Sequence, residues 1–259
     1  MTGSAAPGEP DTCSATYRVR FDEAAPDGRI RTSVLLRYTQ DLAALHSTAR
    51  GFGREWYAER GLTWLVRAAE VAILAPIEVS AELIGTTRVV GWRRVWARRR
   101  TEFLDEAGAL AAWVLIDWVL LDARGAPTRI PAEFDSVFGA PAATFGLARV
   151  ALAEPPADAT RTVLAVRPQE LDPMVHVNNA VYADWLEEAV LAAGGSELVR
   201  AIPRLARLEY VRAVEAGARP DVAVWPDAGG WSCRVADSGG ADGEPADRLR
   251  ARLESIAAG

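Results

Sequence analysis

The chain opens with an alternating segment that is followed by one amphipathic stretch. Apolar and basic residues alternate over residues 16–21, which predicts a short strand. From Ser33, a suitable helix N-cap residue, apolar side chains recur every three or four positions as far as Gly51, which suits the residue after a helix end. The first unit is therefore expected to begin with a strand and one long helix. The apolar stripe of that helix is formed by Leu35, Tyr38, Leu42, Leu45 and Ala49.

After this helix the hydrophobic period shortens to two residues, which is typical of strands. Strands are predicted at residues 64–74, 81–90, 92–104 and 110–121, and the last is almost continuously apolar, as at the centre of a sheet. One helix followed by several antiparallel strands predicts an α+β unit in which a curved sheet wraps the helix.

Residues 132–160 are rich in Pro, Ala and Gly, which predicts a linker that crosses the surface. The order of elements then starts again, with a strand at residues 162–166 and a helix at 178–193. Further strands are predicted at residues 205–214, 221–225, 231–236 and 249–253, with a loop at 238–245. The pattern therefore predicts two units, residues 15–131 and 161–255, that form a degenerate internal repeat. The expected fold class is α+β, with two antiparallel sheets that could join edge to edge and so remove two exposed edges.

Composition narrows the classes of function. The net charge of −6 argues against a nucleic-acid partner, because such proteins carry a basic field. The longest apolar run, residues 109–121, is too short to span a bilayer and contains Asp117, so no membrane partner is expected. The start shows no signal-peptide pattern, and Cys13 and Cys233 are interpreted as free thiols. We therefore expect a cytoplasmic protein.

The residues that can carry chemistry gather just before the second predicted helix. Asp172 and His176 lie there in a loop, and Asn178 or Asn179 can cap the helix. Backbone N–H groups near residues 177–179 could stabilise the oxyanion that forms when a thioester carbonyl is attacked. A carboxylate can activate water or attack directly, and an imidazole can orient that water or protonate the leaving thiolate. The residues predicted to contact the substrate are Met174, Val177, Asn178, Asn179 and Trp64, and no metal or cofactor is implied.

The segment Asp172-Pro-Met-Val-His176-Val-Asn-Asn-Ala-Val-Tyr182-Ala-Asp-Trp185 resembles the Asp-x3-His-Val-Asn-Asn-x2-Tyr-x2-Trp motif of hotdog thioesterases. It is similar to the acyl-ACP thioesterases of plants and bacteria and to the single-hotdog 4-hydroxybenzoyl-CoA thioesterase type. The first half resembles the acyl-ACP group at residues 42–51, 63–67 and 112–117, as does Leu208-Glu209-Tyr210 in the second. The resemblance covers residues 16–255. It implies a double hotdog that hydrolyses an acyl thioester, on an acyl carrier protein more than on CoA, with Asp172 and His176 catalytic and the first unit supplying the acyl pocket.

Two positions depart from the acyl-ACP pattern. Met174 stands where that group commonly has an Asn that helps hold the reacting water or carbonyl, and Ala213 and Val214 stand where an acidic residue or Cys is common. Met is frequent at the first position in the single-hotdog group, so we favour hydrolysis centred on Asp172. Three alternatives stay open: another reaction on a bound thioester (dehydration, cyclisation or acyl transfer), a non-catalytic acyl-carrier partner, or an Asp and His that merely cap the turn and helix.

Tryptophan and arginine carry further predictions. Five of the nine Trp fall in predicted strands of the first unit, where they form core or wall a pocket for a bulky or aromatic acyl group. The run Arg98-Arg99-Arg100 is either a solvated strand face or a docking site for an acidic carrier protein or CoA phosphates. His46 is expected to be a hydrogen-bonded, partly buried histidine, and both a monomer and a homodimer are compatible with the sequence. The five tryptophans are Trp64, Trp92, Trp96, Trp113 and Trp118.

Overall fold

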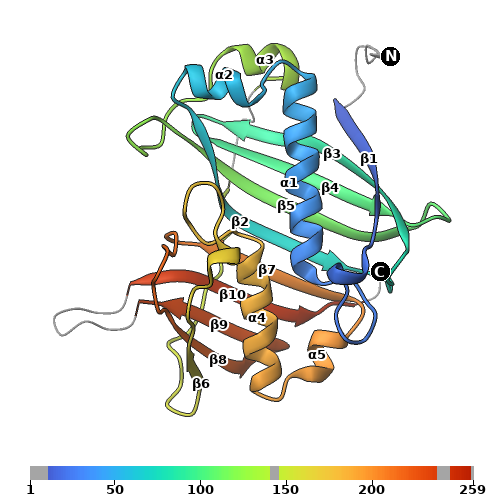
Figure 1. Cartoon of the computed structure of the whole chain (residues 1–259), viewed down its shortest axis with the longest axis vertical. Helices are drawn as coiled ribbons and strands as arrows, with labels where there is room; N and C mark the ends of the chain where they lie inside the picture. Colours follow the sequence, from blue (N-terminus) through green and yellow to red (C-terminus); the bar gives the residue numbers. More distant parts are fainter. Residues whose placement is uncertain (1–10, 141–145, 238–245, 258–259) are drawn as a thin grey trace.

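A single antiparallel sheet of ten strands runs through the computed structural model, which describes residues 11–140, 146–237 and 246–257 (Figure 1). The strand order is β1-β3-β4-β5-β2-β7-β10-β9-β8-β6. The loop predicted at residues 238–245 lies outside the described residues. The first half supplies β1 (Thr12–Arg18), β2 (Thr63–Ile73), β3 (Glu82–Arg93), β4 (Trp96–Leu104) and β5 (Leu110–Leu121). The second half supplies β6 (Thr160–Val163), β7 (Arg204–Tyr210), β8 (Asp221–Asp227), β9 (Gly230–Ala236) and β10 (Asp247–Ser255).

The two halves join through one pair of strands. β2 and β7 run antiparallel, with Ala68 opposite Glu209 at one end of the pairing and Ile73 opposite Arg204 at the other. The expected edge-to-edge union of two sheets is therefore confirmed. Each of these strands would otherwise present a row of unpaired backbone groups to water.

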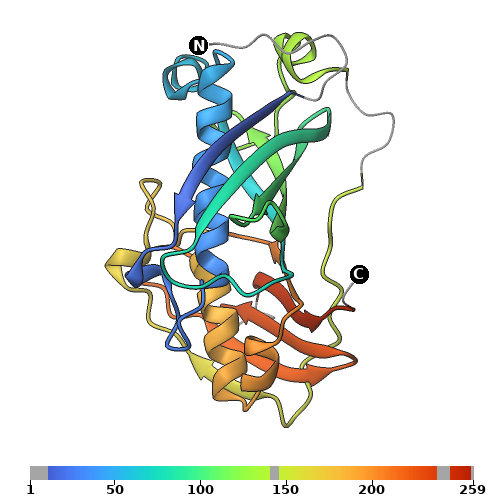
Figure 2. The ribbon, with the colours of Figure 1, turned by 90° about the vertical axis from the view of Figure 1, so that its right-hand side faces the viewer.

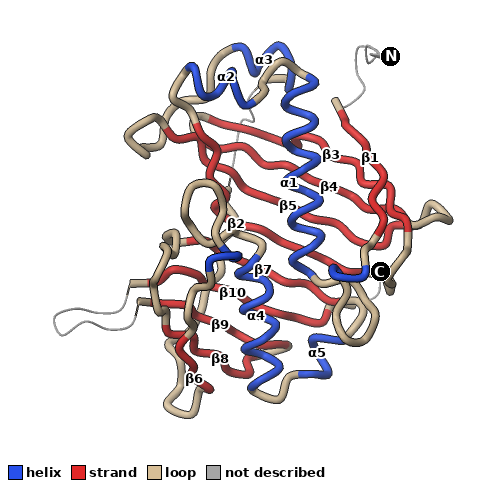
Figure 3. Tube along the Cα trace, in the orientation of Figure 1, coloured by secondary structure: helices blue, strands red, loops and turns tan. Residues whose placement is uncertain are grey.

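Two helices lie on one face of this sheet, α1 (Thr32–Ala49) over the first half and α4 (Val181–Ala192) over the second (Figures 1 and 3). They contact each other where the halves meet. There the Thr32 hydroxyl donates to Glu187 Oε1 over 2.6 Å, and Arg204 lies 3.3 Å from the same oxygen. Both side chains of this ion pair are largely buried, and this burial raises the pKa of Glu187. In the described residues no helix is both long and apolar enough to cross a bilayer.

Three short helices were not predicted: α2 (Arg54–Glu59), α3 (Glu133–Phe138) and α5 (Ser196–Arg200). Several boundaries also differ from the prediction. β1 starts at Thr12 and ends before Phe21, which lies in the 3-10 turn Phe21–Glu23 and is 89% exposed. The strand predicted from the alternation at residues 16–21 therefore extends too far toward the C-terminus. Likewise β7 ends at Tyr210 rather than at residue 214.

The linker predicted at residues 132–160 contains a helix and packs against the sheet, instead of only crossing the surface. It begins with α3, whose Phe134 packs into an aromatic cluster with Phe52. Residues 146–150 then cross the sheet face opposite the helices (Figure 2). Two buried carboxylates fasten this segment: Asp117 Oδ2 accepts the N–H of Ala148 over 2.8 Å, and Glu209 Oε2 accepts the N–H of Val150 over 3.0 Å. Both faces of the sheet are thus covered near the join.

Candidate active site

Asp172 and His176 close a tight loop that precedes α4. The N–H of Asp172 donates to the carbonyl of His176 over 2.8 Å, and the N–H of Val175 donates to the carbonyl of Asp172 over 2.9 Å. The half-buried Asp172 carboxylate accepts the N–H groups of Met174 (2.9 Å) and His176 (3.3 Å), both through Oδ1. In the described part of the chain nothing is hydrogen-bonded to Oδ2. The carboxylate is therefore held by one oxygen while the other has no protein partner.

The first unit contains the same loop without the carboxylate. There the N–H of Ala25 donates to the carbonyl of Arg29 over 2.7 Å, and the N–H of Gly28 donates to the carbonyl of Ala25 over 2.9 Å. Ala25 thus occupies the place of Asp172, and Arg29 that of His176. Asp27 caps the loop from within by accepting the N–H of Arg29 over 3.1 Å.

This internal comparison bears on the alternative in which Asp172 only caps a turn. The backbone hydrogen bonds of the loop form equally well with Ala25 at the first position, so the fold does not require a carboxylate there. The next residues repeat as well, because the N–H of Ile30 donates to Ile77 just as the N–H of Val177 donates to Val214, each over 2.9 Å. The cap on the equivalent N–H, that of Arg29, comes from Asp27 instead, so the loop backbone alone does not fix a carboxylate at the position of Asp172.

Asp172 and His176 line one cavity of about 240 Å³ at the junction of the two units. The structure brings every residue that was predicted to contact the substrate into this wall. Gln40 of α1, Trp118 of β5 and Ala213 also contribute, so both halves of the chain form the site. We call it the junction cavity. The predicted contact residues found in its wall are Met174, Val177, Asn178, Asn179 and Trp64.

The prediction that backbone N–H groups near residues 177–179 stabilise an oxyanion is wrong at residues 177 and 178, whereas the N–H of Asn179 has no acceptor among the described residues. The N–H of Val177 donates to the carbonyl of Val214, and the N–H of Asn178 donates to that of Glu170 over 2.8 Å. Neither group is free for a ligand, because the backbone bonds that anchor the loop consume both. The Asn178 side chain closes a turn just before α4, with Oδ1 accepting the N–H of Ala180 over 2.9 Å. The N-cap residue of α4 is Ala180 and no side chain caps the helix, so the predicted capping by Asn178 or Asn179 is wrong.

Asn179 offers a different polar group at this place. Its Oδ1 is buried and has no hydrogen-bond partner among the described residues, and its side chain lines the junction cavity. A side-chain amide presents either its oxygen or its NH₂ group when it turns over. Asn179 can therefore donate to an oxyanion, which the engaged amides of the loop cannot do.

Two buried tyrosines hold the surrounding backbone. The hydroxyl of Tyr210 donates to the carbonyl of Asn179 over 2.9 Å, and that of Tyr182 accepts the N–H of Val214 over the same distance. Burial raises the pKa of Tyr182 to about 12, and it also raises that of Tyr210. Both hydroxyls stay neutral near pH 7. The sequence showed Tyr182 as part of the motif but gave no sign of the role of Tyr210.

The two departures noted in the sequence leave apolar groups in the wall. Met174 is 47% exposed at the loop tip, and Ala213 lines the junction cavity. In the described part of the chain, no three His, Cys, Asp or Glu side chains gather as they would around a metal ion. The ionisable groups of the second unit that line the cavity are Asp172, His176, Tyr182, Tyr210 and Arg212.

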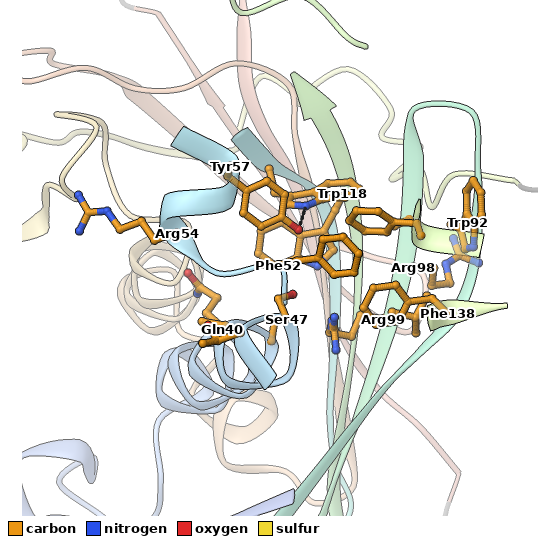
Figure 4. Close-up of a pocket in the computed structure, with 17 residues that line it drawn as sticks. Gln40, Ser47, Phe52, Arg54, Tyr57, Trp92, Arg98, Arg99, Trp118 and Phe138 are labelled. Atoms are coloured by element: carbon orange, nitrogen blue, oxygen red, sulfur yellow. Dashed lines mark hydrogen bonds between the residues drawn. The ribbon is translucent and has the colours of Figure 1, made fainter. Parts of the chain in front are cut away.

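A second cavity of about 280 Å³ lies in the first unit beside α1, and we call it the aromatic cavity (Figure 4). Gln40, Trp64 and Trp118 line both cavities, so the two adjoin. The Nε1–H of Trp64 donates to the hydroxyl of Tyr57 over 2.9 Å, a contact that fixes both rings. The aromatic side chains of its wall are Phe52, Tyr57, Trp64, Trp92, Trp118, Phe134 and Phe138.

The run of three arginines does not form an open docking surface. Alternation along β4 separates Arg99 from its neighbours: Arg98 forms two hydrogen bonds to Asp117, over 2.6 and 2.7 Å, and Arg100 lies 2.7 Å from Glu102. Arg98 and Arg99 both line the aromatic cavity, but Arg98 is paired with Asp117, and Arg99 is only 6% exposed. The docking prediction is therefore wrong for Arg99, and the charges of the other two are already matched by carboxylates.

His46 is fully buried and hydrogen-bonded on both ring nitrogens, which confirms the prediction in a more buried form. Its Nδ1 lies 2.8 Å from Arg99 Nη1, and its Nε2 lies 2.8 Å from Asp11 Oδ2. An arginine can only donate, so Nδ1 accepts and the imidazole is neutral with its proton on Nε2. Burial and the neighbouring Arg99 charge lower the pKa of His46, in agreement with that assignment.

Three solved structures share this fold over nearly their whole length. The first is a putative oleoyl thioesterase from Lactobacillus plantarum, at 19% identity and a TM-score of 0.80, with 96% of this chain and 98% of that chain covered. The 12:0-ACP thioesterase from Umbellularia californica follows at 22% identity and 0.76, covering 95% and 97%. An acyl-ACP thioesterase from Bacteroides thetaiotaomicron follows at 16% and 0.75, covering 94% and 97%.

Family models extend the likeness from fold to sequence. Residues 10–137 match the acyl-ACP thioesterase N-terminal domain, and residues 153–231 match the acyl-ACP thioesterase C-terminal domain. No curated protein sequence matches the chain. The two matches together span most of its length and meet at the linker. The chain therefore belongs to the acyl-ACP thioesterase family and is a thioester hydrolase.

Proposed function

We propose that this enzyme hydrolyses an acyl group, of fatty-acid or polyketide type, that is carried as a thioester on an acyl carrier protein in the cytoplasm. The observation that carries the proposal is the arrangement of Asp172, whose Oδ2 has no protein partner, in the same cavity wall as His176. The adjoining aromatic cavity offers the acyl group a place away from water, and the family supports the carrier.

In this proposal Asp172 acts as general base or as nucleophile. Its Oδ2 takes a proton from the attacking water, or attacks the carbonyl itself to give an anhydride that water then opens. His176 orients that water or protonates the departing thiolate. The Asn179 amide donates to the oxyanion. Each role fits a side chain that lines the junction cavity.

Arg212 and Arg54 are better placed than the three arginines of β4 to contact a carrier protein or the phosphates of CoA. Arg212 lines the junction cavity and Arg54 lines the aromatic cavity, and both are exposed. Neither side chain forms an ion pair with a described residue, so both charges are available to a phosphate of the pantetheine arm. Charge reversal at Arg212 should raise the KM for a carrier-bound substrate.

The proposal is tested with a panel of acyl-carrier and acyl-CoA thioesters, with products identified by mass spectrometry. We expect free acid, and we expect Asp172→Asn to lower kcat by about 10²–10⁴-fold, the range for removal of a general base. The matched control is Asp27→Asn in the equivalent loop of the first unit, which should retain full activity.

The other outcomes separate the alternatives. An unsaturated, cyclised or transferred product would replace hydrolysis by a different reaction on the thioester. Binding without any product would indicate a non-catalytic carrier partner. Wild-type activity in Asp172→Asn would remove Asp172 from the chemistry.

A further inference from the structure

The aromatic cavity contains a positive charge that a plain hydrocarbon chain would not use. Arg99 lies in its wall and reaches from β4 toward Ser47 of α1 (Figure 4). Arg99 is 6% exposed, and its one side-chain hydrogen bond among the described residues runs from Nη1 to the neutral ring of His46. Burial lowers the pKa of Arg99 to about 10, so the group is still charged near pH 7.

No carboxylate of the described residues lines this cavity; of the two other arginines in its wall, Arg98 is paired with Asp117 and Arg54 is exposed to water. The carboxylate of Asp11 acts on Arg99, but it lies beyond His46 and is also bound by Arg50. A buried cation is costly unless an anion or strong acceptors lie against it. The charge of Arg99 is therefore only partly balanced by the protein itself, through His46 and Asp11, which do not line the cavity.

Other polar groups lie on the same wall. The hydroxyl of Tyr57 accepts the Trp64 Nε1–H. The Ser47 hydroxyl and the Arg99 charge both oppose the rise in the pKa of Tyr57 that burial causes. Burial raises the pKa of Tyr57, so its own proton is retained and can be donated. The cavity thus combines flat aromatic walls with a group of donors formed by Arg99, Tyr57 and Ser47.

These donors lie away from the reaction centre. Arg99, Tyr57 and Ser47 line the aromatic cavity and not the junction cavity, whereas Gln40, Trp64 and Trp118 line both. An acyl group whose thioester lies at Asp172 would pass these three shared residues first. Its far end would then meet Arg99.

We propose that the aromatic cavity binds a ring-containing acyl group with an acidic oxygen, a carboxylate or a phenol, at the end remote from the thioester, and that Arg99 binds this oxygen. The inference rests on the proposed function, because that function places the thioester in the junction cavity. A charge-assisted hydrogen bond from a buried guanidinium selects such an acyl group over an apolar one of the same shape.

The test compares pantetheine thioesters of two arylalkanoic acids that differ only at the far ring position, carboxylate in one and methyl in the other. We expect the wild-type kcat/KM to favour the carboxylate by at least about tenfold, the effect of a hydrogen bond to a charged group. Arg99→Gln should lower this preference by about ten- to a hundredfold, and Arg99→Lys should retain part of it. The matched control is Arg100→Gln, which removes the neighbouring charge on the opposite face of β4 and should leave the preference unchanged.

Binding of the two free acids, followed by quenching of tryptophan fluorescence, separates this inference from the proposed function. Trp64, Trp92 and Trp118 line the cavity and report its occupancy. Selective binding of the dicarboxylic acid, lost in Arg99→Gln, would support the inference even if no thioester were hydrolysed. Two results would overturn this inference and leave the proposed function standing. In the first, the wild-type enzyme hydrolyses linear acyl thioesters but prefers the methyl compound to the carboxylate. In the second, Arg99→Gln lowers kcat/KM equally for both compounds.

Discussion

Glu209 provides a sharp test of how the two halves are held together. It lies on β7 opposite Ala68 of β2, and it is 1% exposed. Its Oε1 lies 2.5 Å from Arg149 and 3.8 Å from Arg67, and its Oε2 accepts the N–H of Val150. One carboxylate therefore connects both central strands to the linker, and we predict that Glu209→Gln destabilises the protein.

The size of the loss follows from these contacts. The glutamine can still accept the N–H of Val150, so that hydrogen bond is retained. Arg149 is 61% exposed, so its ion pair contributes at most about 1 kcal/mol. Arg67 is 20% exposed and would lose its one carboxylate, and removal of one member of a buried pair costs about 3–5 kcal/mol. Because Arg67 keeps partial contact with water, we expect a loss of about 2–3 kcal/mol in the free energy of unfolding.

The assay is urea unfolding of the variant beside Glu102→Gln. Glu102 also pairs with two arginines, Arg100 and Arg88, but it is 30% exposed and fastens no other segment. That control should lose no more than about 1 kcal/mol. Limited proteolysis of Glu209→Gln should also cut residues 146–150 faster than in the wild type. Equal, small losses in the two variants would refute the account of Glu209 as the fastening of the linker.

Two further predictions concern the strained loop and the buried histidine. Val175 has φ +63° where the equivalent loop has Gly28, and a side chain in this conformation costs about 1–2 kcal/mol. Val175→Gly should therefore raise the urea midpoint, although the greater flexibility of glycine in the unfolded chain offsets part of the gain. The pKa of His46 is lower in the folded protein than in the unfolded chain, so the unfolded chain binds a proton first as pH falls. The stability that the neutral ring contributes is therefore lost below its ordinary pKa of about 6.5. His46→Asn should flatten the fall in Tm between pH 7 and 5, and an unchanged slope would contradict this.

The periodic segments of the fold could be predicted because their physics is local. The apolar run at residues 110–121 corresponds to β5 (Leu110–Leu121), since a strand covered on both faces is apolar along almost its whole length, here apart from Asp117. The short helices could not be predicted in this way. α3 has six residues, too few to show a period, and Phe134 has a reason to be helical only once Phe52 lies against it.

The site was predictable in part for a similar reason. Asp172 and His176 stand in one local motif, so the sequence brings them together. Arg99 was misinterpreted because a run of three arginines suggests one surface, although strand alternation places the middle one on the other face. Which face leads to a cavity depends on α1 and α3, and which face receives the linker depends on Glu209. Neither dependence is local in the sequence.

The differences between the two repeated units explain why the chain has one candidate site, with a second cavity beside it. The first unit has Ala25 at the place of the loop carboxylate and a helix of 18 residues, whose last turns, at Ser47 and Thr48, wall the aromatic cavity. The second unit has the carboxylate and a helix of 12 residues. Beyond that helix, Gly195 packs so closely that an added Cβ would lie 2.7 Å from Trp231, which fills the space. Under the proposed function, an acyl group bound at Asp172 would therefore extend into the first unit, where the longer helix leaves room for it in the described residues.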